Sequence, residues 1–196
     1  MTEEQQQPAP RRDTTGTPPI PIPVWRINDT HSTPPHELSP RTAGLIIGWY
    51  TSPGDTVVSL GHDPALAGAA GAGGRTYRRL RAPDDLRRVQ HLRGTVTLIV
   101  VSWPPHSQPG GRSREHLVAM FSQCRELMNR DGCTIVTIAE TGTGTYAQHT
   151  PSLLPAAGRA GLQWLRHIVA QPEGSPDEGP VHLDVLVFAV ARSRHG

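Results

Sequence analysis

The chain has 196 residues with 19 basic and 17 acidic side chains, 20 glycines, 20 prolines and 2 cysteines, which is the size and composition of one domain. The net charge of +2 excludes a strongly basic nucleic-acid arm and an acidic tail, because both need many clustered like charges. No lysine occurs, so all 19 basic side chains are arginines, which suit bidentate contacts with phosphate and carboxylate groups.

The beginning of the chain is polar, and no run of about 18 apolar residues occurs anywhere. We therefore expect no signal peptide, no membrane span and a cytoplasmic location. Cys124 and Cys133 are not in a CxxC pair and flank apolar segments, which predicts buried thiols. The 10 histidines form no HxxxH or HxxH spacing, so no metal site is expected.

Residues 1–35 are polar and rich in proline, which predicts a disordered arm. Within this arm, Val24, Trp25 and Ile27 have the apolar side chains needed to pack against the domain. The folded domain is expected to span residues 36–192, and residues 193–196 form a tail.

The first elements of the domain have clear boundaries. Ser39 followed by Pro40 is a helix start, and the apolar residues up to Tyr50 predict a helix that ends at a Ser-Pro-Gly-Asp turn. Thr56–Leu60 is a short β-branched run typical of a buried strand. A helix rich in alanine and glycine is expected from Pro64 to about Ala72.

Strands and helices continue to alternate in the rest of the chain. The strands that we expect are Arg75–Leu80, Val96–Ser102, Cys133–Ala139, Leu162–Ala170 and His182–Ala191. The helices that we expect are Asp84–Leu92, capped by Asp84, then Arg114–Asn129, ended by a turn at Asp131 and Gly132, and finally Pro151–Ala160. Trp49, Trp164 and Phe188 are expected in the core.

This alternation predicts an α/β three-layer sandwich with a mostly parallel, doubly wound sheet. The last two strands are joined by a loop of about ten residues without a helix, so the final strand is expected to be antiparallel. The fold class is therefore a Rossmann-like sheet that ends in an antiparallel hairpin.

Three motifs of this domain occur in a familiar order. A helix ends in Trp-Tyr-Thr-Ser-Pro-Gly-Asp, the next strand reads Thr-Val-Val-Ser-Leu-Gly, and a later strand ends in Ser-Trp-Pro-Pro. Over about residues 34–192 the chain resembles S-adenosylmethionine-dependent methyltransferases, most nearly those that methylate the exocyclic amines of adenine or cytosine in DNA. The resemblance implies the class I methyltransferase fold and S-adenosylmethionine as cofactor.

The resemblance also implies where the cofactor binds. The segment that begins at His36 corresponds to the helix beside the methionine end of the cofactor. Ser59 stands where the family has an acidic residue, Gly61 is the first glycine of the following turn, and Asp63 replaces the next glycine. Near the end of the second strand the family has an acid for the ribose hydroxyls, whereas this chain has Arg78, Arg79, Leu80 and Arg81.

The acceptor site implied by the resemblance is the run Ser102, Trp103, Pro104, Pro105 and His106. In the family, a side chain before Pro-Pro accepts hydrogen bonds from the target amine, and an aromatic residue after it stacks on the flipped base. If Pro-Pro sets the register, the acceptor position holds Trp103, whose indole only donates. If Ser102 is the acceptor, one residue has been inserted. His106 takes the stacking position.

Two functions remain open from the sequence. The first is a divergent, small methyltransferase that transfers a methyl group to an amine of DNA or of a small molecule, with a protein partner that supplies specificity. The second is a catalytically inactive protein of the same fold that binds DNA or a protein partner. An open cleft above Ser59 and Asp63 favours the first, and a bridge between Asp63 and Arg79 favours the second.

Overall fold

The computed structural model describes residues 23–27, 37–61, 63–104, 113–139, 145–172 and 182–190. A seven-stranded sheet in the order β1-β6-β7-β5-β4-β2-β3 lies at its centre. The strands are β1 (Val24–Ile27), β2 (Thr56–Leu60), β3 (Thr76–Leu80), β4 (Val96–Trp103), β5 (Met128–Ala139), β6 (Leu162–Pro172) and β7 (Leu183–Val190).

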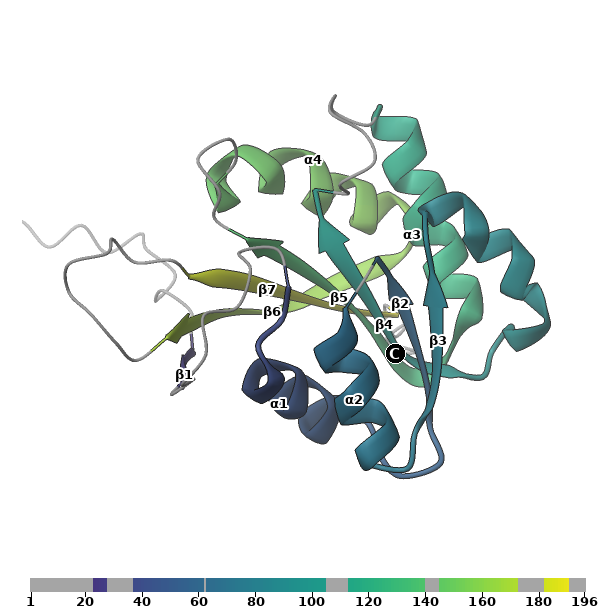
Figure 1. Cartoon of the computed structure of the whole chain (residues 1–196). Coiled ribbons are helices and arrows are strands. Elements are labelled where there is room, and N and C mark those ends of the chain that lie inside the picture. Colours follow the sequence, from purple (N-terminus) through teal and green to yellow (C-terminus); the bar gives the residue numbers. More distant parts are fainter. Residues whose placement is uncertain are drawn as a thin grey trace, which may run out of the picture.

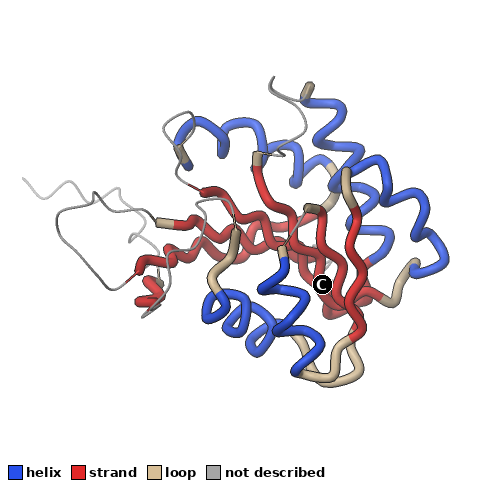
Figure 2. The backbone as a smooth tube through the Cα atoms, viewed as in Figure 1, coloured by secondary structure: helices blue, strands red, loops and turns tan. Residues whose placement is uncertain are grey.

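Only β7 runs against its neighbours, since it is antiparallel to both β5 and β6 while the other pairs are parallel. The helices α1 (Pro40–Tyr50) and α2 (Pro64–Ala72) cover one face of the sheet. The other face carries α3 (Arg114–Leu127), α4 (Tyr146–Arg159) and the 3-10 helix η1 (Pro83–Leu92) (Figure 1). The strands thus form one layer between two helical layers (Figure 2), which confirms the predicted α/β sandwich with a closing antiparallel hairpin.

The first two helices begin and end where the sequence predicts, because their start signals are local. The Ser39 hydroxyl accepts a hydrogen bond from the Thr42 amide at 3.1 Å, and Pro40 occupies the first helical position. Asp63 caps α2 in the same way, since its carboxylate accepts from the Leu66 amide at 2.8 Å ahead of Pro64.

Each face of the sheet has its own apolar core. On the α3 and α4 side, the rings of Phe121 and Phe188 lie 5.5 Å apart and are fully buried. Both cysteines are buried thiols, as predicted, and burial raises the pKa of Cys124 and of Cys133 to about 12. Complete burial of a side chain such as Phe188 contributes about 1.5–3 kcal/mol.

Several helices and strands begin or end at other residues than the sequence predicts. Segment Pro83–Leu92 is a 3-10 helix, and the carboxylate of Asp85, rather than Asp84, accepts from the amides of Arg81 and Ala82. Helix α3 ends at Leu127, and β5 begins at once, so there is no turn at Asp131 and Gly132. At this point the backbone of Gly132 passes so close to the Val96 carbonyl oxygen that a Cβ would lie 2.8 Å from it. Val96 belongs to β4, the strand with which β5 pairs.

Helix α4 starts five residues earlier than predicted, at Tyr146 instead of Pro151. Proline inside a helix removes a backbone donor, which is why the sequence favours Pro151 as the first residue. The structure tolerates it because Leu153, Ala156 and Ala157 are buried against the sheet.

Trp49 and Trp164 are also misassigned, because 65% and 43% of their surfaces are exposed. Trp49 lies at the end of α1, where its ring is 6.4 Å from that of Trp25. Trp25 belongs to β1, a strand absent from the predicted elements, which pairs in parallel with β6. Ile27 is 3% exposed and Trp25 is partly buried against the core, as predicted, whereas Val24 is 53% exposed.

Candidate functional site

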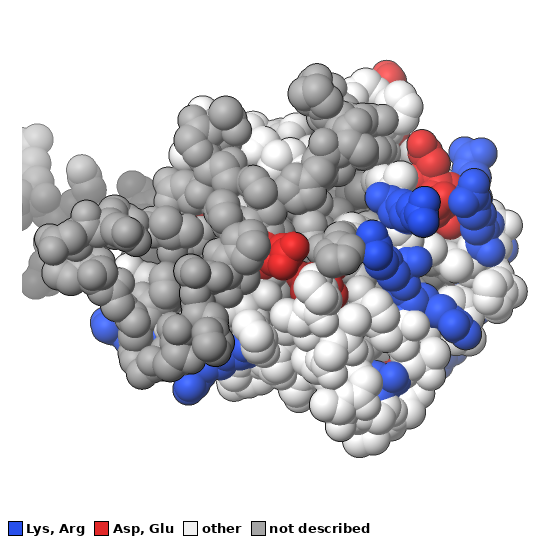
Figure 3. Space-filling model, in the orientation of Figure 1, with Lys and Arg blue, Asp and Glu red and all other residues white. Residues whose placement is uncertain are grey.

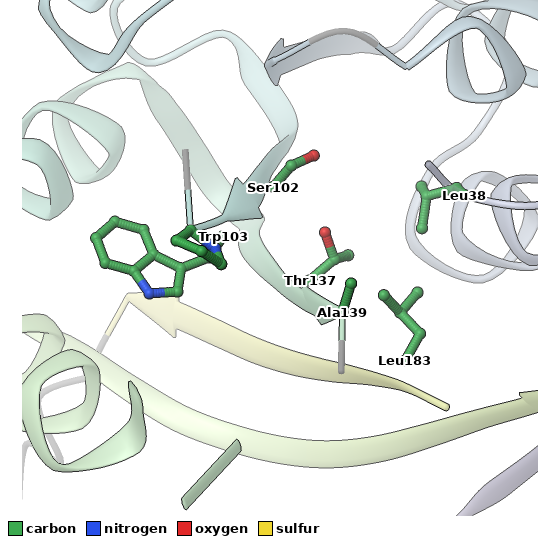
Figure 4. A pocket seen from close by; sticks show the side chains of 7 residues that line it. Leu38, Ser102, Trp103, Thr137, Ala139 and Leu183 are labelled. Atoms are coloured by element: carbon green, nitrogen blue, oxygen red, sulfur yellow. The ribbon is translucent and has the colours of Figure 1, made fainter. Parts of the chain in front are cut away.

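A pocket opens at the carboxyl edge of the sheet, where β4, β5 and the beginning of β7 meet the start of α1. It holds about 260 Å³, including solvent at its mouth, and is lined by Leu38, Ser102, Trp103, Pro104, Thr137, Ala139 and Leu183. Figure 4 shows the hydroxyls of Ser102 and Thr137 pointing into the space across from Leu38. The Thr137 hydroxyl donates to the Val101 carbonyl over 3.5 Å, which is the long limit of a hydrogen bond.

The turn after β2 comes directly beside Ser102. Gly61 has a φ of +129°, and a Cβ on it would lie 3.4 Å from the Ser102 Oγ. Its amide donates to the Leu80 carbonyl at 3.0 Å, which holds the turn against the end of β3. The backbone angle favours glycine here, and an added Cβ would lie in ordinary van der Waals contact with the Ser102 side chain.

These two residues mark the point where the sheet changes winding direction. From β2 the chain crosses to β3 on one side, and then returns to β4 on the other side of β2. In open α/β sheets, ligands bind in the crevice at the carboxyl ends of two such strands. Gly61 follows β2 and Ser102 lies near the end of β4, so both border this crevice.

Asp63 is buried, and its carboxylate holds two helix starts in place. It is 3% exposed, and its carboxylate accepts from the amide of Leu66 and, at 3.2 Å, from the amide of Leu38. This contact fixes the residue just before α1 at the edge of the pocket. Asp63 therefore positions Leu38, because its carboxylate joins two backbone amides on the same face of the sheet.

Ser59 stands one residue before the end of β2, fully buried, with its Oγ in no hydrogen bond of good geometry. The hydroxyl of Tyr77 lies nearby and donates to the Asp63 carbonyl over 3.5 Å. Burial raises the pKa of Tyr77, and the neighbouring Ser59 hydroxyl acts in the opposite direction. Ser59 and Tyr77 thus place two uncharged hydroxyl groups next to the Gly61 turn.

The two residues of the Ser-Trp pair face opposite sides of the sheet. Ser102 points into the pocket, whereas the Trp103 indole is 7% exposed and packs edge-on against His149 of α4, with the rings 6.2 Å apart. The indole Nε1 of Trp103 and the Nε2 of His149 are both buried without a hydrogen bond. Of the two registers left open by the sequence, this geometry favours Ser102 as the group that meets a ligand.

The end of β3 carries no carboxylate among the described residues. Arg79 lies beside Ser59 in the register of β2 and β3, and Arg81 follows Leu80 at the level of Gly61. Guanidinium groups only donate hydrogen bonds, so they do not accept from ribose hydroxyls. The turn after β2 and the pocket therefore lie close together, and the end of β3 carries arginines where dinucleotide-binding sheets carry an acid.

A second polar cluster lies at the same edge but on the α4 side, and sequence reasoning missed it. His167 Nε2 is 2.6 Å from Asp184 Oδ1, and His182 Nε2 is 3.5 Å from the other oxygen of that carboxylate. The Tyr146 ring stacks on His167 with centroids 4.3 Å apart. A charged residue inside the apolar run Leu-Asp-Val-Leu-Val is the signal that points to Asp184.

Three of the predicted site residues, His36, Pro105 and His106, lie outside the described residues. Ser59, Gly61 and Asp63 are brought together at the end of β2, and Ser102, Trp103 and Pro104 at the end of β4. Among the described residues, no helix is long and apolar enough to cross a membrane, and no three His, Cys, Asp or Glu side chains gather to hold a metal ion.

No protein-family model matches the sequence, and no curated protein matches it significantly. Among solved structures, a TehB-like SAM-dependent methyltransferase from Corynebacterium glutamicum has a TM-score of 0.45 and 14% identity, over 76% of this chain and 87% of that one. The Burkholderia thailandensis 1,6-didemethyltoxoflavin-N1-methyltransferase, with S-adenosylhomocysteine bound, has a TM-score of 0.48 and 14% identity, over 78% of each chain. Geranyl diphosphate C-methyltransferase from Streptomyces coelicolor, also with S-adenosylhomocysteine, has a TM-score of 0.46 and 12% identity, over 77% of this chain and 80% of that one. The strand order, rather than these partial overlaps, establishes the fold.

Proposed function

We propose that this chain is an S-adenosylmethionine-dependent methyltransferase whose ligands bind at the crevice between the ends of β2 and β4. The observation that carries the proposal is the glycine turn at Gly61, which has a φ of +129° and lies beside the Ser102 hydroxyl at this point of the sheet. A turn without a Cβ lets a ligand reach the backbone, and the pocket beside it has two hydroxyls on otherwise apolar walls.

The cofactor supplies an electrophilic methyl group on a sulfonium centre. Gly61 is the residue that would let the cofactor approach the backbone, and Leu38 shapes the wall held in place by Asp63. Ser102 would accept a hydrogen bond from an N–H of the acceptor amine and orient its nitrogen. Such orientation lowers the barrier to transfer, because the reacting groups are held in place before the reaction.

The acceptor that we propose is an amine, either on a DNA base, as the Ser-Trp-Pro-Pro motif implies, or on a small molecule. Base-specific reading of DNA needs side chains that reach the base edges, and a small domain gains these most simply from a protein partner. DNA and small amines are therefore the two acceptor classes to compare in a transfer assay.

A second candidate is a catalytically inactive protein of this fold that binds DNA or a protein partner. The arginines at the end of β3, in place of an acid, favour it. Among the described residues, the Asp63 carboxylate accepts hydrogen bonds from the amides of Leu38 and Leu66, which is a different arrangement from the Asp63–Arg79 bridge that would support this candidate.

Thermal unfolding with and without about 1 mM S-adenosylmethionine tests the proposal. A ligand at about 100 times its Kd adds about 2.7 kcal/mol, or about 5–10 °C in Tm for a domain of this size. We expect this shift in the wild type and in Gly94→Ala, a glycine that also has positive φ but has nothing within 4 Å. We expect the shift to be lost in Gly61→Ala.

A wild-type protein whose Tm does not move would contradict cofactor binding and leave the inactive protein as the better description. An unchanged shift in Gly61→Ala would place the ligand elsewhere. If the cofactor binds, Ser102→Ala separates the two candidates further, because it should reduce methyl transfer to the acceptor while the cofactor-induced shift in Tm stays.

A further inference from the structure

The arginines at the end of β3 differ from the neighbouring arginines in their contacts with the described residues. Arg78, Arg79 and Arg81 are exposed, and none makes a hydrogen bond or ion pair with a described residue. By contrast, Arg75 donates to Thr51 and Gly73, Arg88 pairs with Asp85 at 3.0 Å, and Arg93 pairs with Glu126 at 2.7 Å. The neighbouring arginines thus have hydrogen-bond or ion-pair partners within the domain, whereas the side chains at the end of β3 can bind a ligand.

Arg79 lies on the same face of the sheet as the candidate site. Side chains alternate along a strand, so Tyr77 and Arg79 point to the face covered by α2, while Arg78 points to the other face. Arg81 directly follows the last residue of β3. The positive charge of Arg79 acts on Tyr77, which agrees with this placement. Arg79 is level with Ser59, and Arg81 is level with Gly61.

The backbone that carries Arg81 is fixed in place. The carboxylate of Asp85 accepts from the amides of Arg81 and Ala82 at 3.1 Å and 3.2 Å and also pairs with Arg88. This carboxylate is therefore already used, and Asp84 is the one further acid at the start of η1. Figure 3 shows the resulting gathering of arginine side chains over β3 and η1.

Edge strands often carry charges that prevent pairing with another sheet. That role needs charges along the length of the strand, whereas β3 begins with Thr76 and Tyr77 and concentrates its arginines at the carboxyl end, next to the crevice. In dinucleotide-binding sheets the same position distinguishes two ligands, because an acid there binds ribose hydroxyls and an arginine accommodates a ribose phosphate.

We infer that Arg79 and Arg81 form a phosphate subsite beside the Gly61 turn, so that an adenosine compound with a phosphate on its ribose binds there more tightly than adenosine itself. Guanidinium groups bind phosphate with paired, charge-assisted hydrogen bonds. The inference rests on the proposed nucleotide site at the end of β2, but it concerns which nucleotide the site takes.

The test is to titrate the full chain with adenosine, adenosine 2′-monophosphate, adenosine 3′-monophosphate, adenosine 5′-monophosphate and S-adenosylmethionine by calorimetry at low salt. We expect the 2′- or the 3′-phosphate to lower the Kd about 10- to 100-fold relative to adenosine, the range for hydrogen bonds to charged groups. The 5′-monophosphate controls for charge alone, because its phosphate lies at the other end of the sugar.

Arg79→Gln and Arg81→Gln should each remove most of this preference and leave the Kd of adenosine unchanged. Arg130→Gln is the matched control, because Arg130 is exposed and unpartnered but lies near the amino end of β5. Equal affinities for all the adenosine compounds, or a preference that survives in Arg79→Gln and Arg81→Gln, would overturn the inference. Tighter binding of a short duplex DNA than of any ribose phosphate, lost in the same variants, would also overturn it.

The two proposals fail in different ways. If S-adenosylmethionine binds and the ribose phosphates show no advantage, the phosphate subsite is wrong and the proposed function stands. If a ribose phosphate binds through Arg79 and Arg81 while S-adenosylmethionine does not, the subsite stands and the methyltransferase proposal fails.

Discussion

Asp63 shows how one buried carboxylate serves two elements at once. One oxygen accepts from the first turn of α2, and the other accepts from the amide of Leu38 ahead of α1. A carboxylate in such a place is easily taken for a ligand-binding group, since it follows the glycine of the β2 turn. Its contacts instead make it the residue that keeps the wall of the pocket in position.

Replacing Asp63 should therefore affect stability in two steps. Asp63→Asn keeps an oxygen for the Leu66 amide, but an amide nitrogen does not accept from Leu38, so we expect a loss of about 1 kcal/mol of unfolding free energy. Asp63→Ala removes both acceptors and should cost about 2–3 kcal/mol. Urea unfolding of the three proteins measures this, and equal stability of Asp63→Ala and wild type would contradict the described role.

At the scale of elements, the junction between α3 and β5 has no room for a side chain. A Cβ on Gly132 would lie 2.8 Å from the Val96 carbonyl oxygen and 3.1 Å from side-chain atoms of Asn129 and Met128. The carbonyl belongs to the backbone of β4, which is paired with β5 and does not move independently. This close approach is what allows β5 to begin directly after the helix.

Gly132→Ala should accordingly lower the free energy of unfolding by about 1–3 kcal/mol, the usual cost of overpacking. Gly158→Ala is the matched control, because Gly158 lies inside α4 with nothing within 4 Å of an added Cβ. That variant should be more stable than wild type by about 0.4–1 kcal/mol. Chemical denaturation of both proteins checks the pair, and a destabilised Gly158→Ala or a neutral Gly132→Ala would contradict it.

For the whole molecule, the partly buried His149 links stability to pH. Desolvation lowers the pKa of His149 below its ordinary value of 6.5, and its Nε2 is buried without a hydrogen bond. Between the folded and the unfolded pKa, the unfolded chain binds the additional proton. The contribution of His149 is therefore complete above about pH 6.5 and is lost as the pH falls toward the folded value.

We expect the free energy of unfolding to decrease below pH 6.5 and to decrease less steeply in His149→Gln. The comparison isolates His149 from the other histidines, including His167 and His182 beside Asp184. Parallel stability curves for the two proteins between pH 5 and pH 7 would show that His149 does not couple the fold to pH.

Sequence reasoning predicted the parts of the site whose signals are local. The N-cap at Ser39, the strand before Gly61 and the apolar strand through Ser102 lie where expected, because caps, turns and β-branched runs act over a few residues. It did not separate the roles of Ser102 and Trp103. Which face of a sheet each one meets depends on the register with β5 and on the helices above it.

The sequence by itself determined the alternation of strands and helices, the antiparallel final strand, the burial of both cysteines and the absence of an acid at the end of β3. The tertiary structure decided the addition of β1 beside β6, the continuation of α4 through Pro151, and the exposure of Trp49 and Trp164. It also brought His167 and Asp184 together, and it left Arg79 and Arg81 unpartnered beside the Gly61 turn. Contacts between residues far apart in the chain produce these features, so local sequence patterns alone do not determine them.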